Sequence, residues 1–165
     1  MVLGHLGVAV FIVGVGLTSI YSTEKDVSLR TGESYELGGY TFAFKGVENR
    51  DGPNVRANRG TVEITRDGEP VTVLYPEKRV YRVQTMPMTE AGIDAGLFRD
   101  LFVALGDPLG ANAWAVRLYH KPFIRWIWLG SLIMGIGGIL AASDRRYRVL
   151  ARRERELAAG SGAAA

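Results

Sequence analysis

The sequence predicts two membrane-spanning helices that flank a small all-β domain, either a β-barrel or a β-sandwich. Three observations support this fold class. Residues 2–22 contain no Asp, Glu, Lys or Arg, and residues 123–142 contain only Arg125. Between these apolar runs, residues 23–122 contain several short stretches in which apolar and polar side chains alternate, which is the period of a half-buried strand.

Charge is distributed unevenly along the 165 residues, whose formal net charge is +3. The central segment 23–122 carries 13 basic and 14 acidic side chains, whereas residues 143–165 carry six Arg and three acids. Nucleic-acid binding is therefore not expected, because it requires a basic face on the folded domain. The chain has no cysteine, which excludes a disulfide framework and cysteine-based metal sites within it. The expected divisions are a helix over 1–22, a β domain over 23–122, a helix over 123–142 and a basic tail over 143–165.

The first apolar run, from Val2 to Ser22, is long enough to cross a membrane. A helix rises about 1.5 Å per residue, so about 20 residues cross a hydrocarbon core of roughly 30 Å. A cleaved signal peptide is the alternative. It would have a basic start and a shorter apolar stretch, whereas the first Lys or Arg here is Lys25. We therefore interpret this run as a membrane span.

The second apolar run, from Phe123 to Ala142, begins with residues typical of a membrane interface. Trp126 and Trp128 suit the depth of lipid headgroups, and Arg125 can extend to the nearby surface. A buried core helix of a soluble protein is the alternative, which the charged segment directly after the run disfavours. Glycines are costly in soluble helices but permit close approach between membrane helices. The run contains four: Gly130, Gly135, Gly137 and Gly138.

The arginines after the second run predict the orientation of the chain. Because Lys and Arg next to a span remain in the cytoplasm, the C-terminus is expected there. Two spans return the chain to the same side, so the N-terminus is also expected in the cytoplasm. The central domain would then lie in the periplasm of a Gram-negative cell. The arginines concerned are Arg145, Arg146, Arg148, Arg152, Arg153 and Arg155.

Alternation and turn residues predict five to seven short strands in the central domain. Phe42 and Phe44 fall on one face of a strand, and Val62 and Ile64 fall on one face of another. Turns are expected where glycine can adopt a positive φ angle, at positions 38–39 and 67–68. Further strands are expected at 35–37, 71–75 and 114–119, whereas 97–105 is compatible with a strand or a short helix.

The central domain contains no recognisable catalytic motif. Asp51 is interpreted as a turn residue rather than a ligand. Met86 and Met88 are interpreted as packing residues, with a haem-facing or partner surface as the alternative. The acidic residues of 90–107 have no histidine beside them for acid–base work, so no hydrolytic chemistry is expected.

His5 is the residue of the first span that can carry chemistry. A histidine in an apolar span is costly unless it is paired or bound to a ligand. It lies 16 residues before Tyr21, or about 24 Å of helix, which places it roughly 6 Å inside the cytoplasmic edge of the core. Gly4 and Gly7 have no side chains, so a flat, bulky ligand could approach the helix beside His5. Ligation of haem iron and a hydrogen bond to a neighbouring helix both remain possible from the residues alone.

His120, the other histidine of the chain, precedes the second span at the opposite membrane face. The thickness of the membrane separates it from His5, so the two imidazoles are not expected to share one iron. His120 is interpreted as an interfacial polar residue.

Several segments resemble the C-terminal end of the CcmF family, the cytochrome c-type biogenesis membrane proteins of the haem lyase complex. The resemblance covers nearly the whole chain before the tail. It rests most on Lys121-Pro-Phe-Ile-Arg-Trp-Ile-Trp128. Further similar segments are residues 4–10, 88–94, 99–107, 114–120 and 142–147.

The resemblance implies a specific role for one residue. By motif match, His5 would be an axial ligand of a membrane haem b, with the second axial ligand outside this chain. The chain would be the last part of a longer inner-membrane protein and would not be catalytic alone. The family takes haem from the chaperone CcmE and attaches it to apocytochrome c, with CcmH as partner. The expected partners are therefore membrane lipid, the remainder of CcmF, CcmE, CcmH and apocytochrome c.

A second class of function remains open. The chain could be a non-enzymatic membrane anchor that presents its β domain as an assembly or receptor subunit.

Overall fold

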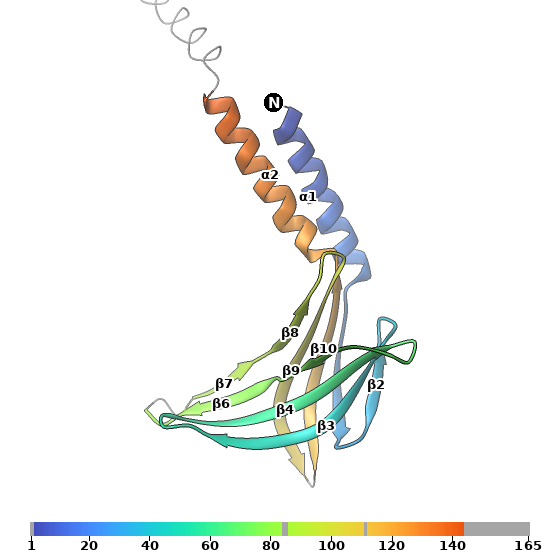
Figure 1. Cartoon of the computed structure of the whole chain (residues 1–165), viewed down its shortest axis with the longest axis vertical. Helices are drawn as coiled ribbons and strands as arrows, with labels where there is room; N and C mark the ends of the chain where they lie inside the picture. Colours follow the sequence, from blue (N-terminus) through green and yellow to red (C-terminus); the bar gives the residue numbers. More distant parts are fainter. Residues whose placement is uncertain (1, 84–85, 111, 144–165) are drawn as a thin grey trace, which may run out of the picture. The chain divides into compact units, whose positions relative to one another are not determined.

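The computed structural model describes residues 2–83, 86–110 and 112–143. It divides into two units, one made of Met1–Val15 with Trp126–Ala165 and the other of Gly16–Arg125. Figure 1 shows the elements in chain order, with one helix at each end of a run of strands. Beyond Ser143, the basic tail lies outside the described residues.

The first unit is a pair of helices, most of α1 (Val2–Tyr21) and most of α2 (Ile124–Ser143). Both helices are long and apolar enough to cross a membrane. The two helices are antiparallel, because Gly137 of α2 contacts Gly4 near the start of α1, and Ile127 near the start of α2 contacts Gly14.

Glycines form the seam between the two helices. A Cβ atom added to Gly7 would lie 2.6 Å from the backbone nitrogen of Met134, and one added to Gly130 would lie 2.5 Å from that of Phe11. The buried residues of the helix pair are Gly7 and Gly14 of α1 and Gly130 and Gly137 of α2. Two glycines seven residues apart fall on one face of each helix, so the backbones approach closely along the seam.

The four glycines of α2 were expected to permit close approach between the helices, and this is right for two of them. Gly135 and Gly138 have open space where a Cβ would be, so they do not contribute to the seam. Only Gly130 and Gly137 face α1, because helical periodicity turns the other two away from it.

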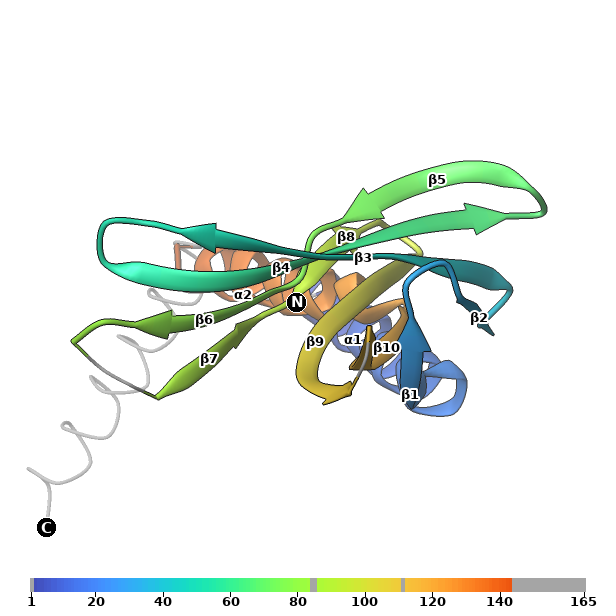
Figure 2. The same ribbon diagram turned by 90° about the horizontal axis from the view of Figure 1, so that it is seen from below.

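The second unit contains two antiparallel sheets (Figures 1 and 2). One sheet has the strand order β1-β10-β9-β8, and the other has the order β2-β3-β4-β6-β7, with β5 also paired to β4. The strands are β1 (Thr23–Arg30), β2 (Ser34–Leu37), β3 (Tyr40–Asp51), β4 (Val55–Arg66), β5 (Glu69–Leu74), β6 (Glu77–Tyr81), β7 (Pro87–Glu90), β8 (Gly92–Ala95), β9 (Arg99–Gly110) and β10 (Ala113–Pro122).

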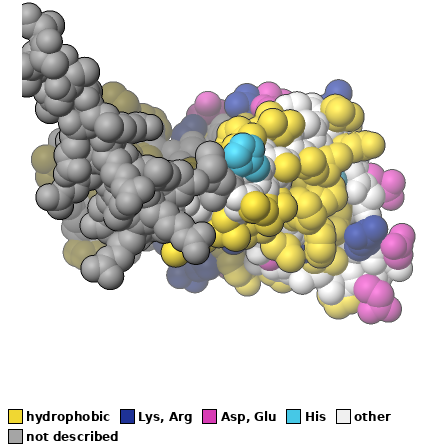
Figure 3. Space-filling view, turned by 90° about the horizontal axis from the view of Figure 1, so that it is seen from above, with side chains coloured by type: hydrophobic (Ala, Val, Ile, Leu, Met, Phe, Trp, Pro, Cys, Tyr) yellow, Lys and Arg dark blue, Asp and Glu magenta, His cyan; other side chains and the backbone are white. Residues whose placement is uncertain are grey.

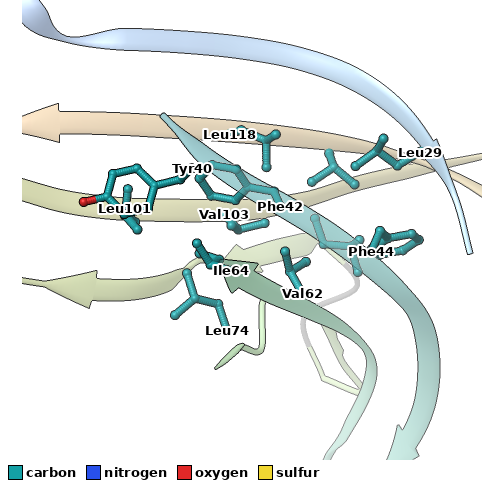
Figure 4. Close-up of a cluster of buried hydrophobic side chains, with 12 residues drawn as sticks. Leu29, Tyr40, Phe42, Phe44, Val62, Ile64, Leu74, Leu101, Val103 and Leu118 are labelled. Carbon is teal, nitrogen blue, oxygen red and sulfur yellow. The ribbon is translucent and has the colours of Figure 1, made fainter. Parts of the chain in front are cut away.

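One hydrophobic core joins the two sheets (Figure 4). The predicted inward residues Phe42, Phe44, Val62 and Ile64 are all buried, which confirms the alternation on β3 and β4. The other sheet contributes a matching row of aliphatic side chains. These are Leu29 of β1, Leu101, Val103 and Leu105 of β9, and Val116 and Leu118 of β10.

The predicted turns are confirmed. Gly38 and Gly39 have φ angles of 61° and 78° between β2 and β3, and Asp67 and Gly68 have 52° and 85° between β4 and β5. Two consecutive positive φ angles match the twist of a tight antiparallel hairpin. The predicted fold class is also confirmed, as a β-sandwich flanked by two long apolar helices.

The described residues contain ten strands rather than five to seven. The additional strands include β1, whose charged sequence lacks clear alternation, and the four-residue strands β7 and β8. The ambiguous stretch 97–105 belongs to β9 from Arg99 onward, because hydrogen bonds to both β8 and β10 decide its conformation.

Candidate functional site

His5 lines a shallow groove between α1 and α2. The groove has a volume of about 340 Å³. Apart from the imidazole, the lining is apolar, and four of its seven residues are Gly or Ala. The lining residues are Gly4, His5 and Val8 of α1, and Met134, Gly137, Gly138 and Ala141 of α2. Viewed from above, hydrophobic side chains cover much of the face that is coloured by residue type (Figure 3).

The groove follows from the glycine positions. Gly137 packs against the backbone of Gly4, so the helices are close here. Gly138, one residue further along α2, has open space at its Cβ position and leaves the groove uncovered. The expected space for a ligand beside His5 is therefore present at Gly4. The same expectation was wrong for Gly7, which is buried in the seam.

His5 is the only titratable side chain among residues 2–15 and 126–143. It lies on the exposed part of α1 rather than in the seam. An imidazole nitrogen is a good ligand for haem iron, and an apolar lining rich in glycine suits the approach of a porphyrin. The groove residues therefore fit one face of a haem. In the described part of the chain, no three His, Cys, Asp or Glu side chains lie together as a metal-binding group.

His120 belongs to the other unit and contributes nothing to the groove. It lies on β10 opposite Thr23, the first residue of β1. Its ring is 5.6 Å from that of Tyr40, and its Cγ and Nδ1 lie 2.6 Å from where a Cβ of Gly38 would be. Burial and the charges of Arg99 and Arg66 hold the pKa of His120 below its usual value. The half-buried His120 ring thus packs against Tyr40, and its interpretation as an interfacial polar residue stays a prediction.

A cluster that the sequence did not reveal surrounds Tyr40. Arg66 Nη1 and Arg99 Nε each donate a hydrogen bond of 3.2 Å to the Tyr40 hydroxyl. Arg99 also pairs with the Asp94 carboxylate, while Arg66 lies 3.8 Å from that of Asp67. Hydrogen bonds to Asp94 and Tyr40 keep the pKa of Arg99 above its usual value despite its desolvation, which opposes them. We call Tyr40, Arg66, Arg99 and His120 the Tyr40 cluster.

Arg125, predicted to extend toward the membrane surface, has a carboxylate partner in the β domain. Its Nε lies 3.4 Å from Oδ1 of Asp100, the one buried acid of the described residues. The same oxygen accepts a hydrogen bond of 3.0 Å from the backbone N–H of Gly96. Asp100 therefore joins the β8–β9 turn to the first residues of α2.

The remaining candidates of the β domain have no catalytic geometry. Asp51 is the exposed last residue of β3, where the chain turns toward β4, as interpreted from the sequence. Met86 and Met88 are exposed, so neither is a core residue.

Comparison with known proteins agrees with this architecture. The family profile described as "CcmF C-terminal beta-sandwich" matches residues 20–122. The cytochrome c-type biogenesis protein CcmF of Pseudomonas aeruginosa is 53% identical over 166 residues, covering 99% of this chain and 25% of that protein. The CcmF protein of Escherichia coli is 52% identical over 148 residues, covering 90% of this chain and 23% of that protein.

A solved structure described as cytochrome c heme lyase CcmF has the same fold. Its TM-score is 0.65 at 20% identity, with 83% of this chain and 23% of the other covered. The fold and the groove thus define a membrane-protein segment in which a β-sandwich lies between two apolar helices. The chain belongs to the CcmF family of cytochrome c-type biogenesis proteins. It spans about a quarter of the length of the curated relatives named above.

Proposed function

We propose that this chain acts as the C-terminal part of a CcmF-type haem lyase subunit in cytochrome c maturation. In this proposal His5 supplies one axial ligand to a haem b in the bacterial inner membrane. The second axial ligand comes from the remainder of the protein. The β-sandwich serves as a periplasmic docking domain during haem transfer from CcmE to apocytochrome c, with CcmH as a further partner.

The His5 groove carries the proposal. An imidazole that lines an apolar groove beside Gly4, Gly137 and Gly138 has the features of one half of a haem site. Family membership supports the haem assignment, because the matched proteins are described as cytochrome c biogenesis proteins or as a heme lyase.

The groove residues would bind and orient the cofactor. His5 would hold one ring nitrogen toward the metal. Gly4, Gly137 and Gly138 would let a flat ring approach the helix backbones, and Val8 would exclude water from that face. When bound, the haem would supply one-electron redox chemistry, which no side chain of the groove can provide.

The membrane placement is part of the same proposal. Both helices have the length and apolarity of membrane spans. The arginines of the sequence beyond α2 favour a cytoplasmic location for both termini, and thus a periplasmic location for the sandwich.

The experiment is a haem spectrum of the full-length parent protein carrying the equivalent of His5→Ala. We expect loss of the b-type Soret and α-band absorbance while the protein still inserts into the membrane. The equivalent of His120→Ala is the matched control, since it removes the other histidine of this segment and should leave the haem absorbance unchanged.

An unchanged spectrum in the His5→Ala protein would contradict ligation by this residue. The chain would then be better described as a membrane anchor that presents a β-domain for assembly.

A further inference from the structure

Both helices join the sandwich at one end of the four-stranded sheet. Thr23, two residues after α1 ends, is paired with His120, four residues before α2 begins. Four residues reach at most about 14 Å, so this end lies within that distance of the start of α2. We call it the helix-proximal end. It includes the Tyr40 cluster and the β8–β9 turn at Gly96–Phe98.

The β8–β9 turn is held against Phe123, the residue before α2, and against Arg125 in the first turn of α2. The Phe123 N–H donates a hydrogen bond of 2.9 Å to the Phe98 carbonyl, and the two rings meet edge to face at 6.2 Å. Asp100 adds its contacts to Gly96 and Arg125. These bonds hold the turn beside the chain segment that enters α2.

Two large apolar side chains are exposed on this fixed turn. Leu97 and Phe98 are 57% and 59% exposed. Moving such exposed apolar side chains out of water lowers the free energy by about 25 cal/mol per Å² of apolar area that becomes buried. Because the turn is next to the start of a proposed span, the acyl–headgroup boundary of a membrane is the apolar medium within its reach.

Cationic donors lie at the same end of the sandwich. Arg66 has one hydrogen bond to Tyr40 and a long, exposed contact of 3.8 Å to Asp67, whose side chain is 92% exposed. A guanidinium has five N–H donors, so Arg66 keeps donors for a further oxyanion. Arg99 is already paired with Asp94 and therefore mainly positions Tyr40. A phosphate group suits the planar fork of Arg66.

We propose that the helix-proximal end is a lipid-binding surface that takes an anionic phospholipid. Leu97 and Phe98 enter the acyl–headgroup boundary, and Arg66, held against Tyr40, binds the headgroup phosphate. This inference rests on the proposed function only in requiring that α1 and α2 span the membrane, and it requires no haem.

The first experiment uses the natural lack of cysteine in this sequence. Single cysteines at positions 97, 109 and 132 of the full chain are labelled with an environment-sensitive fluorophore. The proteins are reconstituted into vesicles of phosphatidylethanolamine and phosphatidylglycerol containing spin-labelled lipid quenchers. Leu109 is the matched control, because it is also 57% exposed and lies near the other end of β9. Leu132 of α2 reports insertion.

We expect strong quenching at position 132, clear quenching at 97 and little at 109. Quenching at 132 with equal, weak quenching at 97 and 109 would overturn the lipid-binding surface while leaving the span intact. Weak quenching at 132 would contradict the span itself and with it the basis of this inference.

The second experiment tests the arginine. Retention of phosphatidylglycerol by the detergent-solubilised full chain is measured by native mass spectrometry for the wild type, Arg66→Gln and Arg117→Gln. Arg117 is the control, since it lies on β10 and is paired in a bidentate manner with Asp26.

One surface cation contributes about 1 kcal/mol, so Arg66→Gln should weaken retention about fivefold and Arg117→Gln should not. Equal retention by the two variants would overturn the role of Arg66, and release by phosphatidylcholine at equal concentration would overturn the preference for an anionic lipid.

Discussion

The helix pair and the sandwich bury opposite kinds of residue. The seam between α1 and α2 buries glycines, whereas the core of the sandwich buries Phe42, Phe44 and a set of aliphatic side chains. In water, burial of large apolar side chains drives folding. Between two helices in lipid that driving force is absent, so close backbone packing replaces it. The sandwich is therefore stabilised by buried side chains and the helix pair by close backbone packing, and a substitution can weaken either one alone.

The largest effect is expected in the core of the sandwich. Phe42→Ala removes a fully buried ring and leaves a cavity, which should lower the free energy of unfolding by about 3–5 kcal/mol. Chemical denaturation followed by tryptophan fluorescence measures the change. Leu109→Ala, at an exposed position, is the control and should have little effect. Similar losses for both variants would contradict the assigned core.

A smaller effect is expected at the helix seam. Gly130→Ala places a Cβ 2.5 Å from the backbone nitrogen of Phe11, so the helices must separate or shift, at a cost of about 1–3 kcal/mol. Gly135→Ala adds the same atom to open space and is the matched control. Spin labels at positions 2 and 140 should report a longer interhelical distance for Gly130→Ala alone. The same distance in both variants would show that the seam does not hold the helices.

A pH effect should distinguish the sandwich from the helix pair. Burial, together with Arg99 and Arg66, lowers the pKa of His120 in the folded state, so folding favours its neutral form. The resulting stability is complete above the ordinary histidine pKa of about 6.5 and is lost as pH falls through the lower folded pKa. Urea midpoints should thus decrease between pH 7.5 and pH 5, and His120→Gln should flatten this decrease. A decrease of the same size in His120→Gln would assign it to other groups.

The smallest effect is expected for the Arg117–Asp26 pair. Its two hydrogen bonds of 2.5 and 2.8 Å lower the pKa of Asp26, but both side chains are exposed. Water and salt screen such a pair, so Asp26→Asn should barely change the urea midpoint at pH 7. A large decrease that disappears in 1 M salt would contradict this expectation.

The sequence predicted those parts of the fold that depend on local pattern. Alternation placed Phe42 and Ile64 in the core, and two consecutive residues suited to positive φ angles identified the hairpin at Asp67 and Gly68. It did not predict β1, whose charged residues have no clear period because only Leu29 of this edge strand is buried. Its pairing with β10 joins residues about ninety positions apart, which no local pattern records.

The candidate sites also differ in whether the local sequence could predict them. His5 could be identified because a histidine in an apolar run is conspicuous in the sequence. The Tyr40 cluster could not, because Arg66 and Arg99 are 26 and 59 positions from Tyr40 and only the sandwich brings them together. The role of Gly7 also depended on where α2 packs, and the sequence of α1 alone does not contain that information.

The most direct test of the account is replacement of the imidazole from solution. In the full-length parent protein, the equivalent of His5→Gly should lose the b-type haem absorbance, and added imidazole should restore it by occupying the space beside Gly4. The equivalent of His120→Gly should keep its haem absorbance with or without imidazole. Undiminished haem absorbance in the His5→Gly protein, without added imidazole, would contradict the claim that this groove supplies a ligand to the iron.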